Sequence, residues 1–355
     1  MENDPNPPNS TMKAAVTLGY GGLEQLVYKD VPVPKPGPDD VLVKVGACGL
    51  NNTDIWFREG RYGSSDDPKA RTGPSRTANA FPRIQGTDVV GRIVEVGAGV
   101  AASRIGERVI VNNTLYGEGY GVGYVGGVGS HRDGGYAEYC AVPADNAMEI
   151  DSPLSDAELA TFPCAYSTAE HMLSRARVSG DDTVLITGAS GGVGSALVQL
   201  AKLRGARVVA LASARKLDLV RSLAPDAAVA YDEGDPVKAV RDAIGREDVD
   251  VALDVVGGRF FTPLMTLLRK RGRYVTAGAI DNPLVQLDLR TVYLKQLDLS
   301  GISLSRREDF AALLGYIRQG RIRPLLHKTF PLSEIHQAQT EFLAKSFFGK
   351  MVVIP

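Results

Sequence analysis

The sequence predicts an α/β protein in which a β-rich domain is combined with a doubly wound parallel sheet. Three observations carry this prediction: short alternating strands and turns fill residues 1–151, strands alternate with helices over residues 152–305, and short strands return in residues 306–355. With 355 residues, the chain is longer than a single hydrophobic core usually supports. We therefore expect two domains, the first of which is completed by the end of the chain.

The first domain is expected to begin after a disordered start of about eleven residues, because MENDPNPPNS has no apolar run. Runs such as VLVKVGACGL and RIVEVG then alternate apolar and polar residues as half-buried strands do. Two stretches, residues 62–83 and 116–135, have neither helical nor strand periodicity. Loops this long in a compact domain are usually functional, so we expect both to shape the mouth of a substrate site.

A Gly-Thr-Asp corner opens the valine-rich segment IQGTDVVGRIVEVGAGV. Gly86 and Gly91 are expected to serve a tight bend and a close approach of two backbones. Asp88 is expected to bond to backbone or to pair with a cation. The corner also presents Thr87, whose role depends on what the fold brings near it.

Six strands are predicted in the second domain, with a helix, SALVQLAKLRG, after the first of them. Their sequences are TVLITG, ARVVALAS, AVAYD, DVALDVV, GRYVTAGA and QLDLSGISL. Apolar strands alternating with helices are typical of a parallel sheet covered on both faces. The later segments IRPLLHKTF and GKMVVIP resemble the strands of the first domain, so we expect them to rejoin it.

A glycine-rich turn joins the first of these strands to its helix. Glycines at a strand-to-helix corner let a pyrophosphate approach the backbone N–H groups at the positive end of the helix. An ordinary tight turn is the alternative, but the placement favours a dinucleotide site. The cofactor-binding residues expected here are Gly188, Ser190, Gly191, Gly192, Val193 and Gly194.

The end of the second strand distinguishes NADP from NAD. NAD sites usually carry an Asp or Glu there, which accepts hydrogen bonds from the ribose. Here Ser213, Arg215 and Lys216 stand in its place, and Tyr231 closes the next strand. A 2′-phosphate would find charge-assisted partners in these side chains, so we predict NADPH as the cofactor. A solvated basic helix start is the alternative.

The same glycines also fit the Thr-Gly-x-x-x-Gly-x-Gly pattern of the short-chain reductases, from Thr187 to Gly194. That class needs a tyrosine followed four positions later by a lysine as its proton donor. None of the 13 tyrosines has such a lysine, and the motif lies in the middle of the chain. We therefore set this interpretation aside.

Taken together, these segments resemble the medium-chain dehydrogenase/reductase superfamily over nearly the whole chain. DDTVLITGASGGVGSALVQLAK looks like the signature of its zinc-independent quinone oxidoreductase branch, and KAAVTLGYGGLEQLVYKDVPVPKPGPDDVLVKV and FGKMVVIP are similar to the usual opening and close. The resemblance implies a GroES-like catalytic domain and a Rossmann NADP-binding domain. The cofactor-binding residues expected from it also include Thr168 and Gly278.

The resemblance implies that this chain binds no zinc. In the zinc alcohol dehydrogenases of the superfamily, the positions matching Asn51, Thr87 and Cys164 hold the catalytic ligands. An amide, a hydroxyl and one thiol are a poor set for zinc, which prefers thiolate and imidazole. The four-cysteine structural lobe is missing as well, since no cysteine lies between Cys48 and Cys140.

Without a metal, a conjugated acceptor is favoured over a simple ketone. Hydride addition to a quinone or enone forms a delocalised oxyanion that hydrogen bonds can stabilise. Positions matching the quinone oxidoreductase loop put Asn51, Trp56 and Tyr62 beside the nicotinamide, with Thr53 at the relay hydroxyl. We expect Asn51, Thr53 and Tyr62 to be catalytic, and Trp56 and Thr87 to line the substrate pocket.

The predicted function is an NADPH-dependent, zinc-independent oxidoreductase that transfers hydride to a conjugated carbonyl acceptor, most simply a quinone. An enoyl or 2-alkenal reductase on the same scaffold is the close alternative. A catalytically weak NADPH-binding protein is an alternative from another class, and a zinc alcohol dehydrogenase is the least favoured.

The partners expected from composition are few. The net charge is −1 with no block of like charge, which indicates a small-molecule substrate and neither nucleic acid nor an anionic membrane. No segment approaches the ~20 apolar residues of a membrane span, and three scattered cysteines indicate a reducing, cytoplasmic location. The strand in residues 296–304 would lie at a sheet edge, so we expect a homodimer formed through it.

Overall fold

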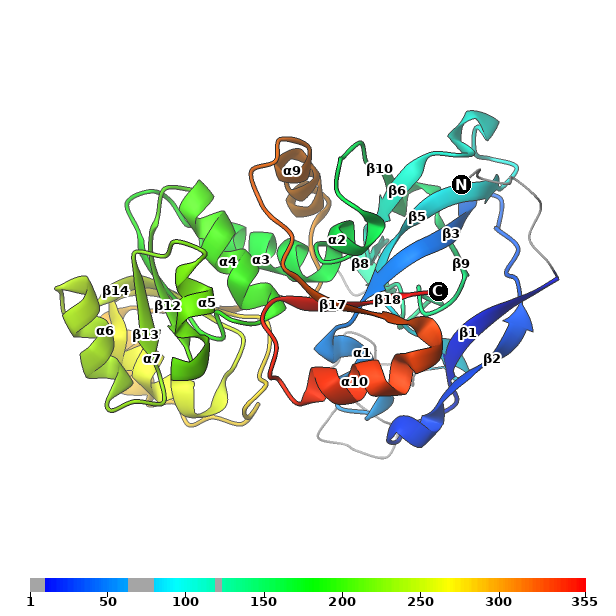
Figure 1. Ribbon diagram of the computed structural model, residues 1–355. Helices are drawn as coiled ribbons and strands as arrows, with labels where there is room; N and C mark the ends of the chain where they lie inside the picture. Colours follow the sequence, from blue (N-terminus) through cyan, green and yellow to red (C-terminus); the bar gives the residue numbers. More distant parts are fainter. Residues whose placement is uncertain (1–9, 63–79, 119–122) are drawn as a thin grey trace. The chain divides into compact units, whose positions relative to one another are not determined.

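The computed structural model describes residues 10–62, 80–118 and 123–355. Two compact units divide the chain, as Figure 1 shows: unit 1 comprises Met1–Cys164 with Pro324–Pro355, and unit 2 comprises Ala165–Arg323. The expectation of a disordered start falls mainly on residues 1–9, which lie outside the described residues. It is wrong for Thr11, which already opens the first strand.

Unit 1 is the β-rich part. A three-stranded sheet has the order β2-β1-β4, and a seven-stranded sheet has the order β10-β6-β5-β3-β18-β17 with β9 also on β3. The strands of the first sheet are β1 (Thr11–Thr17), β2 (Leu26–Pro32) and β4 (Arg83–Ile84). Those of the second are β3 (Asp40–Gly49), β5 (Asp88–Val96), β6 (Arg108–Val111), β9 (Tyr139–Pro143), β10 (Ala147–Glu149), β17 (Leu326–Pro331) and β18 (Lys350–Ile354).

In the described part of unit 1, these sheets are accompanied by the short helices α1 (Asn52–Arg58), α2 (Asp156–Leu159) and α10 (Ile335–Leu343). The return of the chain to this unit is confirmed, because β18 pairs antiparallel with β3 and parallel with β17. The pairing of Val352 with Gly49 brings the end of the chain beside the corner that follows β3 (Figure 1).

The second of the two long loops contains regular structure. β7 (Thr114–Tyr116) and β8 (Tyr124–Gly127) pair antiparallel as a hairpin. The expectation that residues 116–135 lack strands is therefore wrong for part of the segment, because glycine-rich strands lack the alternation that marks strands in a sequence. Of the other loop, residues 63–79 lie outside the described residues.

Unit 2 contains a six-stranded sheet with the order β13-β12-β11-β14-β15-β16, and all of its pairs are parallel. This is the order of a doubly wound dinucleotide-binding sheet, and all six predicted strands are confirmed. They are β11 (Thr183–Ile186), β12 (Arg207–Ala212), β13 (Ala227–Ala230), β14 (Val249–Asp254), β15 (Leu268–Thr276) and β16 (Asp298–Gly301).

Helices connect these strands. They are α3 (Pro163–Arg175), α4 (Gly192–Leu203), α5 (Leu217–Arg221), α6 (Pro236–Ile244), α7 (Phe261–Leu267), α8 (Leu289–Lys295) and α9 (Arg307–Arg318), with the short 3₁₀ turns η5 (Ala214–Lys216) and η6 (Gly258–Phe260). All residues of β11 and β14 are buried, because helices pack over the sheet.

The unit boundaries differ from those that the sequence rhythm suggested, residues 151/152 and 305/306. The helix α2 contacts β3 and β5, so it belongs with the β-rich unit. The helix α9 belongs with unit 2, where the Asp309 carboxylate accepts a hydrogen bond of 2.9 Å from Ser174 Oγ. Helical pattern alone does not show which core a helix packs on.

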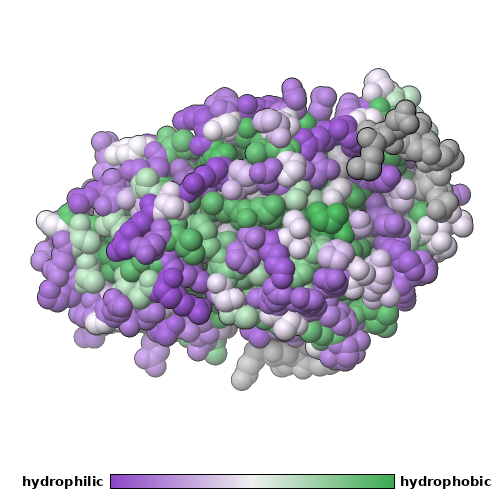
Figure 2. All heavy atoms as spheres, in the orientation of Figure 1, coloured by the Kyte–Doolittle hydropathy of each residue, from purple (hydrophilic) through white to green (hydrophobic). Residues whose placement is uncertain are grey.

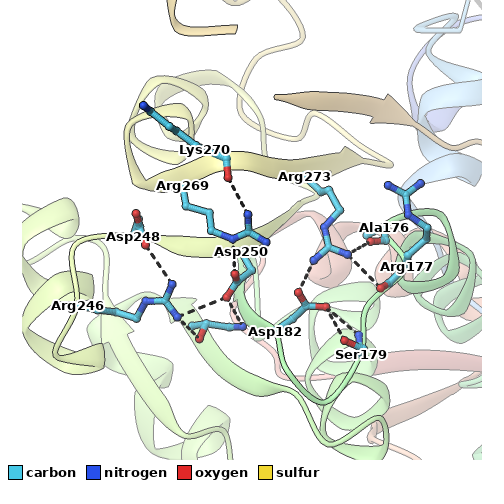
Figure 3. A network of polar contacts seen from close by, with 11 residues as sticks. Ala176, Arg177, Ser179, Asp182, Arg246, Asp248, Asp250, Arg269, Lys270 and Arg273 are labelled. Carbon is cyan, nitrogen blue, oxygen red and sulfur yellow. Dashed lines mark hydrogen bonds and ion pairs between the residues drawn. The ribbon is translucent and has the colours of Figure 1, made fainter. Parts of the chain in front are cut away.

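Ion pairs bind the amino ends of three strands in unit 2 (Figure 3). The Asp250 carboxylate accepts hydrogen bonds from the Thr183 backbone N–H at 2.8 Å and from Arg269 Nε at 2.5 Å. Asp182 accepts the Ser179 backbone N–H at 2.8 Å and pairs with the Arg273 guanidinium. These contacts link the starts of β11, β14 and β15, at the edge of the sheet opposite the glycine turn.

The surface is mixed in character. On the face drawn in Figure 2, hydrophilic side chains are spread over both units, with apolar residues exposed between them. Among the described residues, no helix is long and apolar enough to cross a membrane.

Candidate functional site

A buried ammonium organises the corner between β3 and α1. Lys350 Nζ donates to Asp88 Oδ2 at 2.8 Å, to Asn51 Oδ1 at 2.6 Å and to the Leu50 carbonyl at 2.8 Å. Asn51 Nδ2 donates to the same Asp88 oxygen at 2.9 Å. The side chains of Lys350 and Asp88 are only 4% and 0% exposed, so both charges are removed from water and must be satisfied within the protein.

The other oxygen of Asp88 fixes a fourth segment. Asp88 Oδ1 accepts the Cys164 backbone N–H at 2.7 Å, at the start of α3. Asp88 thus pairs with a cation and also bonds to backbone, the two alternatives that the sequence left open. It holds together Asn51, its neighbour Thr87 and Cys164, the three positions that the resemblance aligned with zinc ligands.

A second buried carboxylate, Asp54, lies at the first turn of α1. Asp54 accepts hydrogen bonds from Tyr136 Oη at 2.7 Å and from the backbone N–H groups of Asn51 and Gly86 at 2.9 and 3.2 Å. Burial is the main cause that raises the pKa of Asp54 to about 6, because its neutral donors and the more distant Lys350 only partly offset the cost of desolvation.

The glycines of the Gly-Thr-Asp corner have the physical reasons that the sequence suggested. Gly86 has a φ of +96°, and a Cβ there would lie 2.8 Å from the Tyr136 backbone nitrogen and 2.9 Å from Cys48 Sγ. A Cβ at Gly91 would lie 2.0 Å from the Lys44 carbonyl oxygen on β3. Gly86 therefore lets the chain turn tightly, so that Thr87 and Asp88 enter the site side by side.

Thr87 pairs with a residue that the sequence did not single out. Asn113 Nδ2 donates to Thr87 Oγ1 at 3.0 Å, and both side chains are buried. Asn113 lies just after β6 and before the β7–β8 hairpin. The hydroxyl of Thr87 accepts this bond, which leaves its own hydrogen able to be donated.

The predicted residues on α1 and just after it lie close together. Tyr62 Oη lies 3.5 Å from Thr53 Oγ1, and the Trp56 and Tyr62 rings meet edge to face with 6.0 Å between centroids. Burial raises the pKa of Tyr62 to about 12, so the phenol stays protonated at neutral pH and can donate a hydrogen bond. Trp56 also packs against the core of unit 1.

The donor set suits a metal poorly. Among the described residues, no group of three or more His, Cys, Asp or Glu side chains could hold a metal ion. The Asn51 oxygen is already bonded to Lys350, and Thr87 offers a neutral hydroxyl. Zinc at this corner would have to bind beside a buried ammonium, which is electrostatically unfavourable.

The glycine-rich turn of unit 2 fits a pyrophosphate. Gly188 has a φ of +59°, and Gly191 caps α4 without any side-chain hydrogen bond. A Cβ at Gly194 would lie 2.1 Å from the Gly188 carbonyl oxygen, whereas one at Gly191 would meet nothing closer than 3.5 Å. Space is thus left at Gly191, in front of N–H groups that have no partner within the helix.

The other glycine-turn residues lie as predicted in sequence, Ser190 in the turn and Gly192 and Val193 in the first turn of α4. Thr187 Oγ1 anchors the turn by donating to the buried Asp254 at 2.6 Å. Thr168 lies on α3, and Gly278 follows β15, where its Cβ would lie 3.2 Å from the Val255 carbonyl oxygen.

The strand ends beside this turn carry cations. Ser213 and Lys216 are largely buried around η5, which also contains Arg215. The Tyr231 N–H donates to the Ala212 carbonyl at 3.1 Å, so Tyr231 lies next to that turn.

Two residues that the sequence did not single out lie near Tyr231 and η5. The Arg259 guanidinium lies 5.5 Å from the Tyr231 ring centroid, and Asp232 Oδ1 accepts the Ala214 N–H at 2.8 Å. A carboxylate is therefore present at the turn after β12, although it comes from the neighbouring strand. Its signal was the YDEGD run, which begins with Tyr231.

Two family descriptions match the chain. Residues 37–152 match the alcohol dehydrogenase GroES-like domain, and residues 192–319 match the zinc-binding dehydrogenase family. The second match covers the strands β12 to β16 of the parallel sheet but begins after β11, and none of Asn51, Thr87 and Cys164 lies within it.

Curated relatives span the whole chain. Rat (Rattus norvegicus) quinone oxidoreductase is 29% identical over 354 residues, covering 97% of this chain and 98% of that protein. Acryloyl-coenzyme A reductase of Metallosphaera sedula is 30% identical over 357 residues, covering 96% and 99%.

Solved structures also match the chain over nearly its whole length. A candidate alcohol dehydrogenase from Sinorhizobium meliloti 1021 superposes with a TM-score of 0.94 at 53% identity, covering 98% of each chain. The 2-octenoyl-CoA carboxylase reductase CinF, solved with NADP and 2-octenoyl-CoA, has a TM-score of 0.85 at 26% identity, covering 98% of this chain and 88% of CinF.

A GroES-like β unit combined with a parallel sheet and its glycine-rich turn defines a class of dinucleotide-dependent oxidoreductases. The chain belongs to the medium-chain dehydrogenase/reductase superfamily, and it is an oxidoreductase by the activities of its relatives.

Proposed function

We propose that this protein is an NADPH-dependent, zinc-independent reductase that transfers hydride to a conjugated carbonyl acceptor, with a quinone as the first choice. The observation that carries the proposal is the corner at Asn51, where hydrogen-bond donors and a buried ammonium stand in place of metal ligands. Such donors suit a delocalised oxyanion and are too weak for a simple alkoxide.

The residues have distinct tasks in this reaction. NADPH, when bound, supplies the hydride to an electrophilic carbon of the acceptor, and a proton from solvent completes the reduction. Asn51 and Tyr62 donate hydrogen bonds to the acceptor oxygen as it gains charge. The Tyr62 O–H, which is directed at Thr53 Oγ1 at 3.5 Å, turns to the acceptor, and the Thr53 O–H then donates to Tyr62 Oη. Trp56 and Thr87 line the acceptor site, where the indole packs on a flat ring.

The preference for NADPH rests on the end of β12. Lys216, Arg215 and Arg259 supply positive charge there, and Ser213 and Tyr231 supply hydroxyls for a 2′-phosphate. Asp232 opposes this preference, since its carboxylate occupies one N–H of the turn. We infer that the three cations outweigh it.

A 2-enal or enoyl-thioester reductase is the second candidate, favoured by the likeness to acryloyl-coenzyme A reductase and to CinF. The test is NADPH oxidation with a panel of quinones and a panel of 2-enals and enoyl thioesters, compared with NADH, before and after chelator treatment. Turnover that prefers NADPH and survives chelation is expected.

Each other outcome selects an alternative. Turnover lost on chelation, together with stoichiometric zinc in the purified protein, would select an alcohol dehydrogenase. NADPH binding without turnover on any acceptor would select a binding protein.

A further inference from the structure

The buried ammonium of Lys350 does not itself donate to the acceptor, because its three N–H groups are bonded within the protein. We propose that Lys350 is a positioning residue, which holds the Asn51 amide in one orientation so that it offers only N–H groups to the acceptor. The inference rests on the proposed function, in which Asn51 contacts the acceptor oxygen.

The orientation of the amide follows from the chemistry of its two neighbours. An ammonium can only donate and an ionised carboxylate can only accept, so the Asn51 oxygen must face Lys350 and its nitrogen must face Asp88. With the three bonds to Asn51, Asp88 and the Leu50 carbonyl, every N–H of Lys350 is used. The reverse orientation would set N–H groups against an ammonium and an oxygen against a carboxylate.

One N–H of Asn51 remains weakly engaged. The first is taken by Asp88 at 2.9 Å, whereas the contact of Nδ2 with the Gly49 carbonyl is 3.5 Å, at the limit of a hydrogen bond. An acceptor oxygen that gains negative charge competes well for this second N–H. The ammonium on Oδ1 also draws electrons out of the amide, which makes its N–H a stronger donor.

A purely structural ion pair explains less of this arrangement. Buried ion pairs are often replaceable by apolar residues without loss of stability, so stability alone gives little reason for one here. Lys350 instead makes its shortest bond, 2.6 Å, to the amide oxygen of Asn51 rather than to Asp88.

The test uses the double variant Lys350→Met/Asp88→Asn, which removes both buried charges and so leaves neither unpaired. The new amide at position 88 can donate, so the Asn51 amide is free to flip. The matched control is Lys328→Met/Glu341→Gln, which removes an exposed ion pair of 2.9 Å in the same unit. Both variants are compared with wild type for kcat, KM, NADPH affinity and the isotope effect with deuterated NADPH.

We expect kcat of the double variant to fall at least tenfold, with a larger hydride isotope effect and unchanged NADPH affinity, while the control matches wild type. The loss should grow with the basicity of the oxyanion across a series of acceptors, because donor strength then matters more. A uniform loss across the series, or no loss, would overturn the proposal.

A measurement independent of turnover separates this inference from the proposed function. In ¹⁵N spectra, the side-chain NH₂ signals of Asn51, assigned by their absence in Asn51→Leu, should be protected from hydrogen exchange in wild type and lose that protection in the double variant. Equal protection in both would refute the positioning role even if no acceptor turns over. Altered protection in a protein that reduces no acceptor would uphold the geometry and reject the proposed function alone.

Discussion

Asp54 and Asp88 both form hydrogen bonds with Asn51 and both are buried, but different groups offset the cost of burying their charges. Asp88 faces an ammonium, whereas Asp54 accepts its hydrogen bonds from a phenol and two backbone amides. A neutral donor offsets less of the cost of burying a charge than a cation does. At the scale of single residues, the charge state of Asp54 therefore responds to mild acid.

The free energy of unfolding should depend on pH through Asp54. Its pKa is about 6 in the folded protein and near the ordinary value of 3.8 when unfolded, so the folded state binds an extra proton between these values. Its contribution to stability is fully present below about pH 4, falls as pH rises through about 6, and is flat above. A shift of this size corresponds to about 3 kcal/mol.

Chemical denaturation of wild type and Asp54→Asn between pH 4 and 7 checks this expectation. The unfolding free energy of wild type minus that of Asp54→Asn should decrease as pH rises across that interval, because only wild type must ionise a buried Asp54. The exposed Asp181→Asn serves as the control and should give a difference independent of pH. A constant difference for Asp54→Asn would contradict the assignment.

At the scale of elements, the turn before α4 combines a position that the fold requires to be glycine with one that it does not. A Cβ at Gly194 collides with the Gly188 carbonyl, while one at Gly191 has room and an ordinary φ of −88°. We therefore propose that a ligand explains the glycine at 191, whereas the close approach of the helix to Gly188 and Ala189 in the turn explains the glycine at 194.

Gly191→Ala should keep the melting temperature of wild type and lose NADPH affinity at least tenfold, because its methyl group fills the space left for the pyrophosphate. Gly194→Ala should lower the melting temperature. Calorimetry and cofactor titration measure the two effects. Gly315→Ala, in α9 with no atom within 4 Å of its Cβ, is the control and should leave affinity unchanged. Unchanged affinity in Gly191→Ala would argue against a pyrophosphate at this turn.

The ion pairs at the amino ends of β11, β14 and β15 contribute to the stability of unit 2. Asp182→Ala leaves the Arg273 guanidinium, 14% exposed, without its carboxylate and should lower the free energy of unfolding by about 3 kcal/mol. The neighbouring exposed Asp181→Ala should change it by less than about 0.5 kcal/mol. Urea denaturation distinguishes the two, and equal effects would mean that the network in Figure 3 contributes nothing specific.

At the scale of the whole molecule, the β16 edge of the parallel sheet is an unpartnered surface of unit 2. β16 pairs only with β15 among the described residues, and exposed apolar side chains gather in the segment before it. They include Leu284, Leu289, Tyr293 and Leu294, exposed by 82%, 68%, 63% and 64%. An open edge beside apolar side chains is a typical pairing surface for a second copy.

We propose that two copies associate through this edge. Sedimentation equilibrium should give twice the chain mass of 37.8 kDa, and Leu289→Asp/Leu294→Asp should reduce it to the single chain. Leu219→Asp, at an exposed leucine on α5, should leave the dimer intact. A monomeric wild type would refute the proposal.

Local patterns in the sequence predicted the architecture well. The six strands of unit 2, the glycine turn between β11 and α4, and the return of the chain to unit 1 are confirmed, because each depends on hydrophobic periodicity or on turn chemistry within a short window. The hairpin β7–β8 and the boundaries at Cys164 and Arg323 were not predicted. Glycine-rich strands have no clear period, and a helical pattern does not indicate the partner of a helix.

The sequence by itself determined the family, the parallel sheet and the poor set of zinc donors, since these follow from residue types at given positions. Only the tertiary structure decided what surrounds them. Lys350 lies 262 residues from Asp88, and Tyr136 lies 82 residues from Asp54. Hydrogen bonds and desolvation act over a few ångströms in space, so the partners that fix the Asn51 amide and raise the pKa of Asp54 become evident only once the chain is folded.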